Sequence, residues 1–563
     1  VSATVYEIKT ALPIDLLWGI IGFIIFTIFF SFIILVLKKP ASRLDLLISL
    51  LLFMIALLLR ILSAKNLSLH HDESIFWQGS FDFLINDWKW SREYMLNGYP
   101  PIFYYILAGL TYFFEFNLIG IRTISFISGS LTVVVLYFLA KSLFNRKVGL
   151  ASALLLCFSS YHIYYSGIAV TDSLVILLML LSTYFFWIGF QRRVLKFFVL
   201  SGLFFGLALD VKYVVIVMVP AVILYIIWIR KSFRFLLEKG VLLWAVSSLV
   251  TIAPIQITLI LNNINIWALY LKQTFGSPLI PGQKFYPIIE LIPRGFRMFI
   301  YSMARTAYPW LPWLSIFEIA ICVSLIITVA FHAYATLKNR SSESFLLIFM
   351  VAMISLLLDP IKHNKWFLYS FPFFFTMLSN ITYRYIHDII TKTSRILGTD
   401  IFDLHKIITI LFGIIFAFSS VFVGITTPFI DKGEYAAIQS SILFIKNRAQ
   451  PYDIIAAFEV RTLFYYIDLY KIDTVPISLK IIELQQTNEE IISARIEVNE
   501  YLLTTLKPRF IIENRAYFNY FYNVTTRQWI LQNYDLVFFS RPSLGYQWVG
   551  TDFYETLVFE RKG

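Results

Sequence analysis

Two adjacent carboxylates, Asp72 and Glu73, follow two histidines in the segment Leu69-His70-His71-Asp72-Glu73-Ser74. The segment comes directly after residues 44–63, an apolar run that is long enough to cross a bilayer. A carboxylate held at a membrane surface can take a proton from a hydroxyl group, which is the chemistry of a general base. The pair therefore indicates a site at which a lipid-borne substrate could react.

Two other uses of these residues remain open. Asp72 or Ser74 could cap a surface helix that begins at Ser74, because both residue types are common at that position. His70 and His71 beside two acids could instead hold a divalent metal ion. Two adjacent histidines cannot both face one ion from a helix, which counts against the metal site.

Arg122 and Lys212 are the charged residues whose positions in apolar segments most suggest a function. Unpaired charge in a membrane segment is costly, so such residues usually mark a functional site. Arg122 could pair with Asp72, with Glu73 or with a donor phosphate. Lys212 could bind phosphate, pair with Asp210 or extend to the lipid headgroups.

Two further basic groups could bind a phosphate. Lys362, His363 and Lys365 gather in one short connection. Three arginines, Arg294, Arg297 and Arg305, fall on one face of a helix at about 100° per residue. That face is either a basic helix surface on the membrane or a phosphate-binding surface.

The composition identifies the class of protein that must position these residues. Hydrophobic residues make up 58% of the 563-residue chain and charged residues 15%, with a mean hydropathy of +0.73. These values predict a polytopic membrane protein. Cys157 and Cys322 both fall in apolar segments, so neither a disulfide framework nor a thiolate metal site is indicated. The net charge of +12 reflects topology and anionic headgroups rather than nucleic acid binding.

We expect about twelve spanning helices, the first of them retained rather than cleaved as a signal. The apolar runs lie near 14–37, 44–63, 118–140, 148–166, 172–190, 196–209, 212–229, 241–260, 314–337, 344–358, 366–384 and 406–426.

Alternate connections carry the basic clusters and are therefore predicted to be cytoplasmic. By parity, the amino terminus, the outer loops 64–117 and 261–313, and everything after residue 426 lie on the extracytoplasmic side. The loop with Lys362, His363 and Lys365 is also outside, against the usual charge bias, which favours phosphate binding there. The clusters are Lys38, Lys39 and Arg43; Lys141, Arg146 and Lys147; Arg192, Arg193 and Lys196; Arg230, Lys231 and Arg234; Lys338 and Arg340; Arg384, Lys392 and Arg395.

In the first outer loop, Tyr99-Pro100-Pro101 opens an aromatic run over residues 101–114 that is too short to cross a bilayer. An interfacial or re-entrant helix that begins at the prolines fits this run, because proline is tolerated in a first turn.

Residues 427–563 alternate apolar strand-like runs with amphipathic helical runs, unlike the 1–426 membrane domain. This pattern predicts a small extracytoplasmic α/β domain. Strands are expected at 454–459, 509–513, 534–539 and 556–560, and helices at 434–447, 489–506 and 517–533. No glycine-rich phosphate loop occurs there, so nucleotide binding is disfavoured.

The order of these motifs resembles that of the GT-C glycosyltransferases, in particular the branch with the protein O-mannosyltransferases, the lipid A aminoarabinose transferase and their archaeal relatives. A membrane helix is followed by the Asp-Glu loop, the Pro-Pro-aromatic run, Arg122, Thr171-Asp172, the run that reaches Lys212, and KHNKWFLYSFPFF at 362–374. The resemblance covers roughly the first 385 residues. Lys365-Trp366 stands where relatives often have an arginine followed by an aromatic residue.

The resemblance implies transfer of a sugar from a polyprenyl (dolichyl-type) phosphate to an acceptor hydroxyl, with inversion, on the extracytoplasmic face. Asp72 would be the base. Glu73, the second acid of the catalytic pair, would orient the acceptor or a basic neighbour, and Tyr99 and Asp172 would border the pocket. No cofactor is required, although His71, Asp72 and Asp172 could hold a divalent metal. Asp172 could instead only cap the helix that follows it.

The implied partners are a polyprenyl-phosphate sugar, membrane lipids and an acceptor protein, glycan or lipid, without nucleic acid. The membrane would be a prokaryotic plasma membrane or the endoplasmic reticulum. A secondary transporter or a flippase for lipid-linked glycans is the rival hypothesis. It predicts broken helices in two related halves with charges at the midplane, whereas these charges gather at the outer rim.

Overall fold

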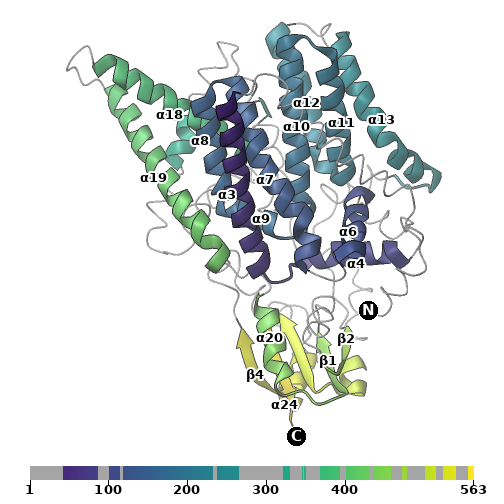
Figure 1. Cartoon of the computed structure of the whole chain (residues 1–563). Helices are drawn as coiled ribbons and strands as arrows, with labels where there is room; N and C mark the ends of the chain where they lie inside the picture. Colours follow the sequence, from purple (N-terminus) through teal and green to yellow (C-terminus); the bar gives the residue numbers. More distant parts are fainter. Residues whose placement is uncertain are drawn as a thin grey trace.

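Long apolar helices form the larger part of the computed structural model (Figure 1). Among the described residues, five helices are long and apolar enough to span a membrane: α3 Arg43–Asn66, α7 Leu118–Leu143, α10 Thr171–Arg192, α13 Lys239–Leu261 and α19 Ile401–Ile430. The polytopic helical class is thus confirmed. The structure describes residues 42–85, 100–114, 118–231, 237–265, 321, 323–329, 345, 348–349, 368–393, 401–430, 436–457, 472–478, 501–514, 524–540 and 556–562, with parts of some ranges described by backbone alone.

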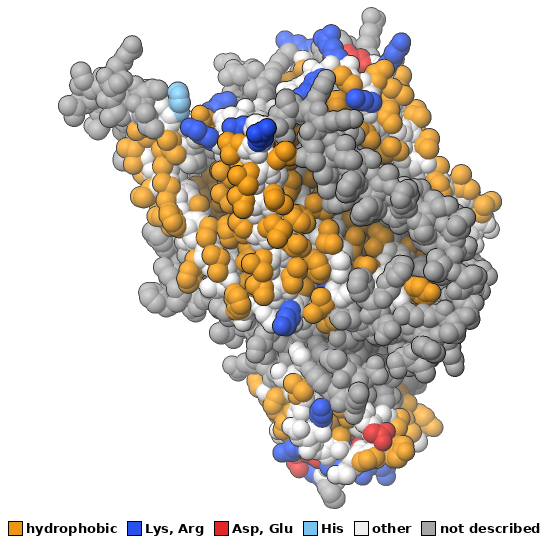
Figure 2. Space-filling view, in the orientation of Figure 1, with side chains coloured by type: hydrophobic (Ala, Val, Ile, Leu, Met, Phe, Trp, Pro, Cys, Tyr) orange, Lys and Arg blue, Asp and Glu red, His pale blue; other side chains and the backbone are white. Residues whose placement is uncertain are grey.

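Shorter elements complete the bundle. They are α11 Leu195–Val211, the 3-10 helix η1 Tyr213–Val217, α12 Met218–Arg230 and α18 Phe371–Thr393. Leucines of α3 such as Leu47, Leu51 and Leu58 are more than half exposed, and Figure 2 shows a broad hydrophobic surface. Exposed apolar area of this extent is what a lipid-facing surface requires. The first predicted span, 14–37, lies outside the described residues, as do most of 314–337 and 344–358.

The run 148–166, predicted as one span, is two helices. α8 Arg146–Cys157 and α9 Ser160–Gly167 meet at an angle of 58°. Ser159 caps the start of α9 by accepting a hydrogen bond from the His162 amide. Together with Ser160 it interrupts an otherwise apolar run. The buried Arg60 guanidinium donates to the carbonyls of Ala56 at 3.0 Å and Cys157 at 3.5 Å. Arg60 thereby satisfies a carbonyl at the end of α8, as a break in a membrane helix demands.

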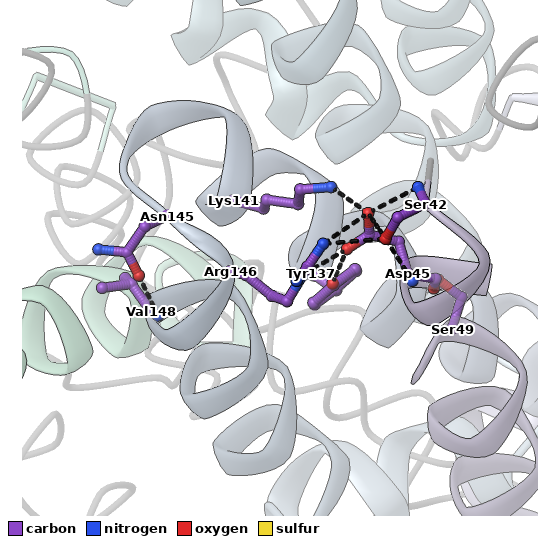
Figure 3. A network of polar contacts seen from close by, with 8 residues as sticks. All are labelled: Ser42, Asp45, Ser49, Tyr137, Lys141, Asn145, Arg146 and Val148. Carbon is purple, nitrogen blue, oxygen red and sulfur yellow. Dashed lines mark hydrogen bonds and ion pairs between the residues drawn. The ribbon is translucent and has the colours of Figure 1, made fainter. Parts of the chain in front are cut away.

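At the amino-terminal end of α3, the buried carboxylate of Asp45 joins α3 to α7 and α8 (Figure 3). Asp45 accepts from Tyr137 Oη at 2.6 Å and Lys141 Nζ at 2.6 Å on α7, and from Arg146 Nε at 2.9 Å on α8. Asp45 also forms a capping box with Ser42 at the start of α3. This network fixes the register of α3 against α7 and α8 at the end of α3 opposite to the loop of Asp72.

Two helices of the first loop pack on each other. α4 covers His71–Ile85 and α6 covers Pro101–Phe114. Phe76 and Phe103 meet edge to face with ring centroids 5.2 Å apart, and Phe83 meets Tyr105 at 4.8 Å. α6 begins at Pro101, which confirms the predicted helix. α4 begins three residues before the predicted Ser74, because His70 caps it, so Asp72 and Glu73 lie inside its first turn.

A mixed five-stranded sheet forms the carboxyl-terminal part, in the order β2-β1-β3-β5-β4. β1 lies between β2 and β3 and pairs parallel with both, whereas β5 pairs antiparallel with β3 and β4. Four strands confirm the predicted α/β domain, but β2 was not predicted. The strands are β1 Asp453–Ala457, β2 Thr474–Ser478, β3 Phe510–Asn514, β4 Tyr534–Ser540 and β5 Thr556–Arg561, and the helices are α20 Ala436–Lys446 and α24 Val524–Asn533.

Alternate strand residues divide between the two faces of this sheet. Ile455, Phe510, Ile512 and Val558 pack with the isoleucines of α20. Ala456, Ile511, Leu557 and Phe559 pack on the other face with Ile530 of α24 and Leu503 of the helical segment 501–506. The sheet is therefore covered by helices on both faces. It lies below the ends of α3 and α9 and near α4 (Figure 1).

Candidate active site

The start of α4 shapes the loop that carries Asp72. His70 Nδ1 accepts a hydrogen bond from the Asp72 amide at 3.1 Å, and Glu73 Oε2 accepts one from the His70 amide at 3.1 Å. The His70 side chain thus takes an N-cap role usually held by serine, threonine, asparagine or aspartate, while Glu73 reaches back to the His70 amide as the N3 acid of a capping box does. The backbone around Asp72 is thus held by the residues on both sides of it.

Glu73 and Arg122 form an ion pair in which both side chains are fully buried. Arg122 Nε donates to Glu73 Oε1 at 2.7 Å, and an Arg122 Nη donates to Oε2 at 2.6 Å. This bidentate geometry is the strongest that arginine and a carboxylate can form. The guanidinium also donates to the carbonyls of Ala64 at 2.6 Å, Leu67 at 2.9 Å and Ser68 at 2.9 Å.

These contacts show that Arg122 pairs with Glu73, one of the partners considered for it, and that Glu73 contacts a basic neighbour as expected. All three guanidinium nitrogens donate to protein acceptors in a fully buried setting, at Glu73 and at the end of α3. Binding of a donor phosphate by Arg122 stays a prediction. Both oxygens of Glu73 likewise accept hydrogen bonds from the protein.

The same carboxylate reaches a second loop. Glu73 Oε1 accepts from the Ala169 amide at 2.8 Å, and Ser125 on α7 donates to the Val170 carbonyl at 3.3 Å. Residue 169 lies three residues before Asp172, a separation of at most about 11 Å along the chain. Glu73 therefore joins the loop of Asp72 to the loop that leads into α10.

Asp172 lies in the first turn of α10 and is almost fully buried. Its Oδ1 accepts from Lys212 Nζ at 2.7 Å and from Tyr369 Oη at 2.7 Å. The helix start has Val170 at its cap with no capping side chain, so the capping role considered for Asp172 is not the one observed. Lys212 pairs with Asp172 rather than with the nearby Asp210, and 20% of its side chain is exposed.

Tyr369 is a member of this cluster that sequence reasoning missed. It belongs to the quoted segment 362–374 and stands four residues after Lys365. The Lys212 ammonium lies 5.8 Å from the centre of its ring. Three separate parts of the chain thus meet at Asp172. The position of Tyr369 inside the basic-aromatic segment was the only sequence signal for it.

Several predicted residues cannot be placed in this site. Tyr99, Arg294, Arg297, Lys362, His363 and Lys365 lie outside the described residues, and His71 is described by its backbone alone. Among the described side chains, no group of three or more His, Cys, Asp or Glu gathers in a way that could hold a metal ion. The metal site with His71, Asp72 and Asp172 therefore stays a prediction.

The arrangement gives the two adjacent acids different chemical capacities. Glu73 is buried and its oxygens are engaged by four hydrogen bonds, from Arg122 Nε and Nη, the His70 amide and the Ala169 amide. Asp72 is partly exposed on the same turn. A partly exposed carboxylate on a rigid turn can accept a proton from a bound hydroxyl. Lys212 supplies positive charge with solvent access at the neighbouring cluster.

Comparisons with known proteins bear on the fold that holds these residues. Residues 99–257 match the profile of the dolichyl-phosphate-mannose-protein mannosyltransferase family. The structure of ArnT from Cupriavidus metallidurans bound to undecaprenyl phosphate is similar in fold, with a TM-score of 0.56 at 11% identity, covering 92% of this chain and 97% of that one. Comparison with curated protein sequences gives no match.

A second solved structure has the same type of fold. It is the oligosaccharyltransferase of Archaeoglobus fulgidus tethered to an acceptor peptide with the NVT sequon, with a TM-score of 0.52 at 13% identity, covering 85% of this chain and 70% of that one. The helical architecture, the profile match and these two neighbours confirm the resemblance of this chain to the GT-C superfamily of membrane glycosyltransferases.

Proposed function

We propose that this protein is an inverting glycosyltransferase that moves a sugar from a polyprenyl phosphate to an acceptor hydroxyl. The family profile describes a transferase that uses dolichyl-phosphate mannose, and the ArnT structure is bound to undecaprenyl phosphate. The observation that carries the proposal is the division of roles between Asp72 and Glu73. Glu73 is buried and accepts hydrogen bonds from Arg122 and from two loops, whereas Asp72 on the same turn is partly exposed.

The reaction that we propose at Asp72 is a single displacement. The Asp72 carboxylate takes the proton of the acceptor hydroxyl as its oxygen bonds to the anomeric carbon. The bond from that carbon to the phosphate oxygen breaks, and its electron pair leaves with the polyprenyl phosphate. Attack opposite to the leaving group inverts the anomeric centre. A phosphate is already a competent leaving group, so the second carboxylic acid that glycosidases use to protonate an alcohol is not needed.

Positive charge must meet the anion that develops on the phosphate. Lys212 is the described candidate, because its ammonium is partly exposed and is oriented by Asp172 and by the ring of Tyr369. Lys362, His363 and Lys365, which precede Tyr369 by a few residues, are proposed to extend this cationic surface, as are Arg294 and Arg297. Charged donors fixed before the reaction stabilise developing charge more effectively than water does.

We place this site on the extracytoplasmic side, in a prokaryotic plasma membrane or the endoplasmic reticulum. This side follows from the predicted charge distribution of the loops. The acceptor is a protein, a glycan or a lipid that carries a hydroxyl group.

The test is a transfer assay with the purified full-length protein in liposomes, supplied with radiolabelled dolichyl- or undecaprenyl-phosphate sugars and a membrane extract as the acceptor source. Asp72→Asn is compared with Asp535→Asn, which changes a well-exposed aspartate of the carboxyl-terminal sheet. We expect transfer by the wild type and by the control, and a loss of at least about 10²-fold in Asp72→Asn, because positioned proton transfer contributes about 10² to 10⁴-fold.

Two results would count against the proposal. Equal transfer by all three proteins would remove Asp72 as the base. If the wild type transfers no label but moves the labelled donor across the liposome membrane, the activity is that of a flippase. Repeating the assay with EDTA tests the predicted independence from a divalent metal.

A further inference from the structure

Leu69, the residue before His70, is buried in the carboxyl-terminal sheet domain rather than among the membrane helices. Its side chain is 1% exposed and belongs to the same core cluster as Ile438, Ile442 and Ile445 of α20. Phe510, Ile512 and Val558 of the sheet also belong to that cluster. A leucine from the outer loop thus fills the face of the sheet that α20 also covers.

A second leucine repeats this arrangement on α7. Leu118 begins α7 and packs partly buried against the same cluster as Leu69. Arg122 follows one turn later, and residues four apart lie on the same side of a helix. Leu69 precedes Glu73 by four residues. Both partners of the buried ion pair are therefore preceded by a leucine that contacts the core of the sheet domain.

The end of α3 is joined to the segment that leads into this domain. Asn66 Nδ2 donates to the Pro428 carbonyl at 2.7 Å, near the end of α19. Arg122 in turn donates to the carbonyls of Leu67 and Ser68. The short stretch between α3 and α4 is consequently held from the membrane helices on one side and from the sheet domain on the other.

We propose that Leu69 is a positioning residue through which the carboxyl-terminal domain sets the placement of Asp72. The inference rests on the proposed function for the role of Asp72, but the mechanical coupling stands on the contacts alone. Leu69 lies three residues before Asp72, and the His70 cap between them transmits its position to the first turn of α4. A shift of about 1 Å at a catalytic group can cost on the order of 10²-fold in rate.

The experiment compares three variants of the full-length protein. Leu69→Ala removes the anchor, and Leu69→Met is a conservative replacement that keeps its apolar volume. Ile511→Ala is the matched control, since it removes an equally buried side chain from the opposite face of the same sheet. Amide hydrogen exchange of residues 70–76 is measured for each protein, together with kcat and KM for the donor.

We expect Leu69→Ala to raise exchange of the Asp72 and Ser74 amides by at least about 10-fold, because the hydrogen bonds at His70 open more often. Its kcat should fall by roughly 10 to 100-fold with little change in KM. Leu69→Met should restore both values towards the wild type. Ile511→Ala should weaken the sheet domain without changing exchange at residues 70–76.

Unchanged exchange and kcat in Leu69→Ala would overturn the proposal, as would an equal rise in exchange in Ile511→Ala. Should Leu69→Ala fail to fold, Leu69→Val provides a smaller truncation with the same expected direction. Hydrogen exchange does not depend on turnover. If the wild type proves inactive as a transferase, the exchange results still decide the coupling, so the two failures can be told apart.

Discussion

Asp72 and Glu73 show how two neighbouring residues of the same chemical type acquire different roles from their surroundings. Successive residues of a helix point about 100° apart, so the two carboxylates leave α4 in different directions. Glu73 points to Arg122 and the Ala169 amide, inside the protein. Asp72 keeps partial access to solvent. An accessible acid beside a rigidly bound one is a suitable arrangement for a base that must meet an incoming substrate.

The buried pair itself leads to a prediction about stability. Glu73→Gln should lower the free energy of unfolding by about 3–5 kcal/mol, because it leaves the Arg122 charge buried without its counterion. The measurement is denaturant or thermal unfolding of the purified protein in detergent. Glu560→Gln is the control, since Glu560 pairs with Arg448 and Arg509 at the surface of the sheet domain, where a pair contributes only about 0–1 kcal/mol. Equal losses in both variants would contradict this account of the site.

The sequence singled out charged residues that the structure brings into contact, but it did not fix which of them pair. Arg122 and Lys212 were singled out because charge in an apolar segment is unusual, and Asp172 through the resemblance of the motif order. The pairs Glu73 with Arg122 and Asp172 with Lys212 join residues 49 and 40 positions apart, and local patterns do not encode such distances. Tyr369 was missed because one tyrosine among 33 carries no distinguishing signal before its neighbour Asp172 is known.

At the level of elements, hydropathy found the helices but not their interruptions. The run 148–166 is apolar throughout except for a few polar residues, so a window of spanning length averages over Ser159 and Ser160. The break appears only when Arg60 and Ser159 are seen to satisfy the helix ends. β2 was missed for a related reason, because Pro476 in TVPIS argues against a strand unless the strand lies at a sheet edge, where β2 does lie.

The break between α8 and α9 gives a second prediction, through its contact with α19. A Cβ added at Gly424 would run into the carbonyl group of Phe158, with the carbonyl carbon 2.8 Å away. Gly424→Ala should therefore destabilise the protein by about 1–3 kcal/mol, the usual cost of overpacking. Gly109→Ala on α6 is the control, because no atom lies within 4 Å of its added Cβ. Alanine there should leave stability unchanged or raise it by up to about 1 kcal/mol, in line with helix propensity. Thermal unfolding of both variants checks the contrast, and equal effects would refute it.

The whole molecule has two chemically different ends. Basic side chains gather at the end of the bundle near Lys141 and Arg146, and the sheet domain lies at the other end, beyond a hydrophobic belt (Figure 2). Loops rich in lysine and arginine usually remain in the cytoplasm. The described fold therefore agrees with a single orientation in which the sheet domain and the loop of Asp72 share the extracytoplasmic side.

This orientation can be tested by labelling single cysteines in intact cells with a reagent that does not cross membranes. Tyr501→Cys places a thiol on the sheet domain, where the side chain is 65% exposed, and Gln191→Cys places one on the exposed last turn of α10, beside Arg192. The native Cys157 is buried and should stay unlabelled in the folded protein, and changing Cys322 to serine removes the other native thiol. We expect Tyr501→Cys to react in intact cells and Gln191→Cys to react only after the membrane is opened. The reverse pattern would place Asp72 on the cytoplasmic side and would require a donor presented in that leaflet, because the sheet domain holds Leu69 three residues from the candidate base.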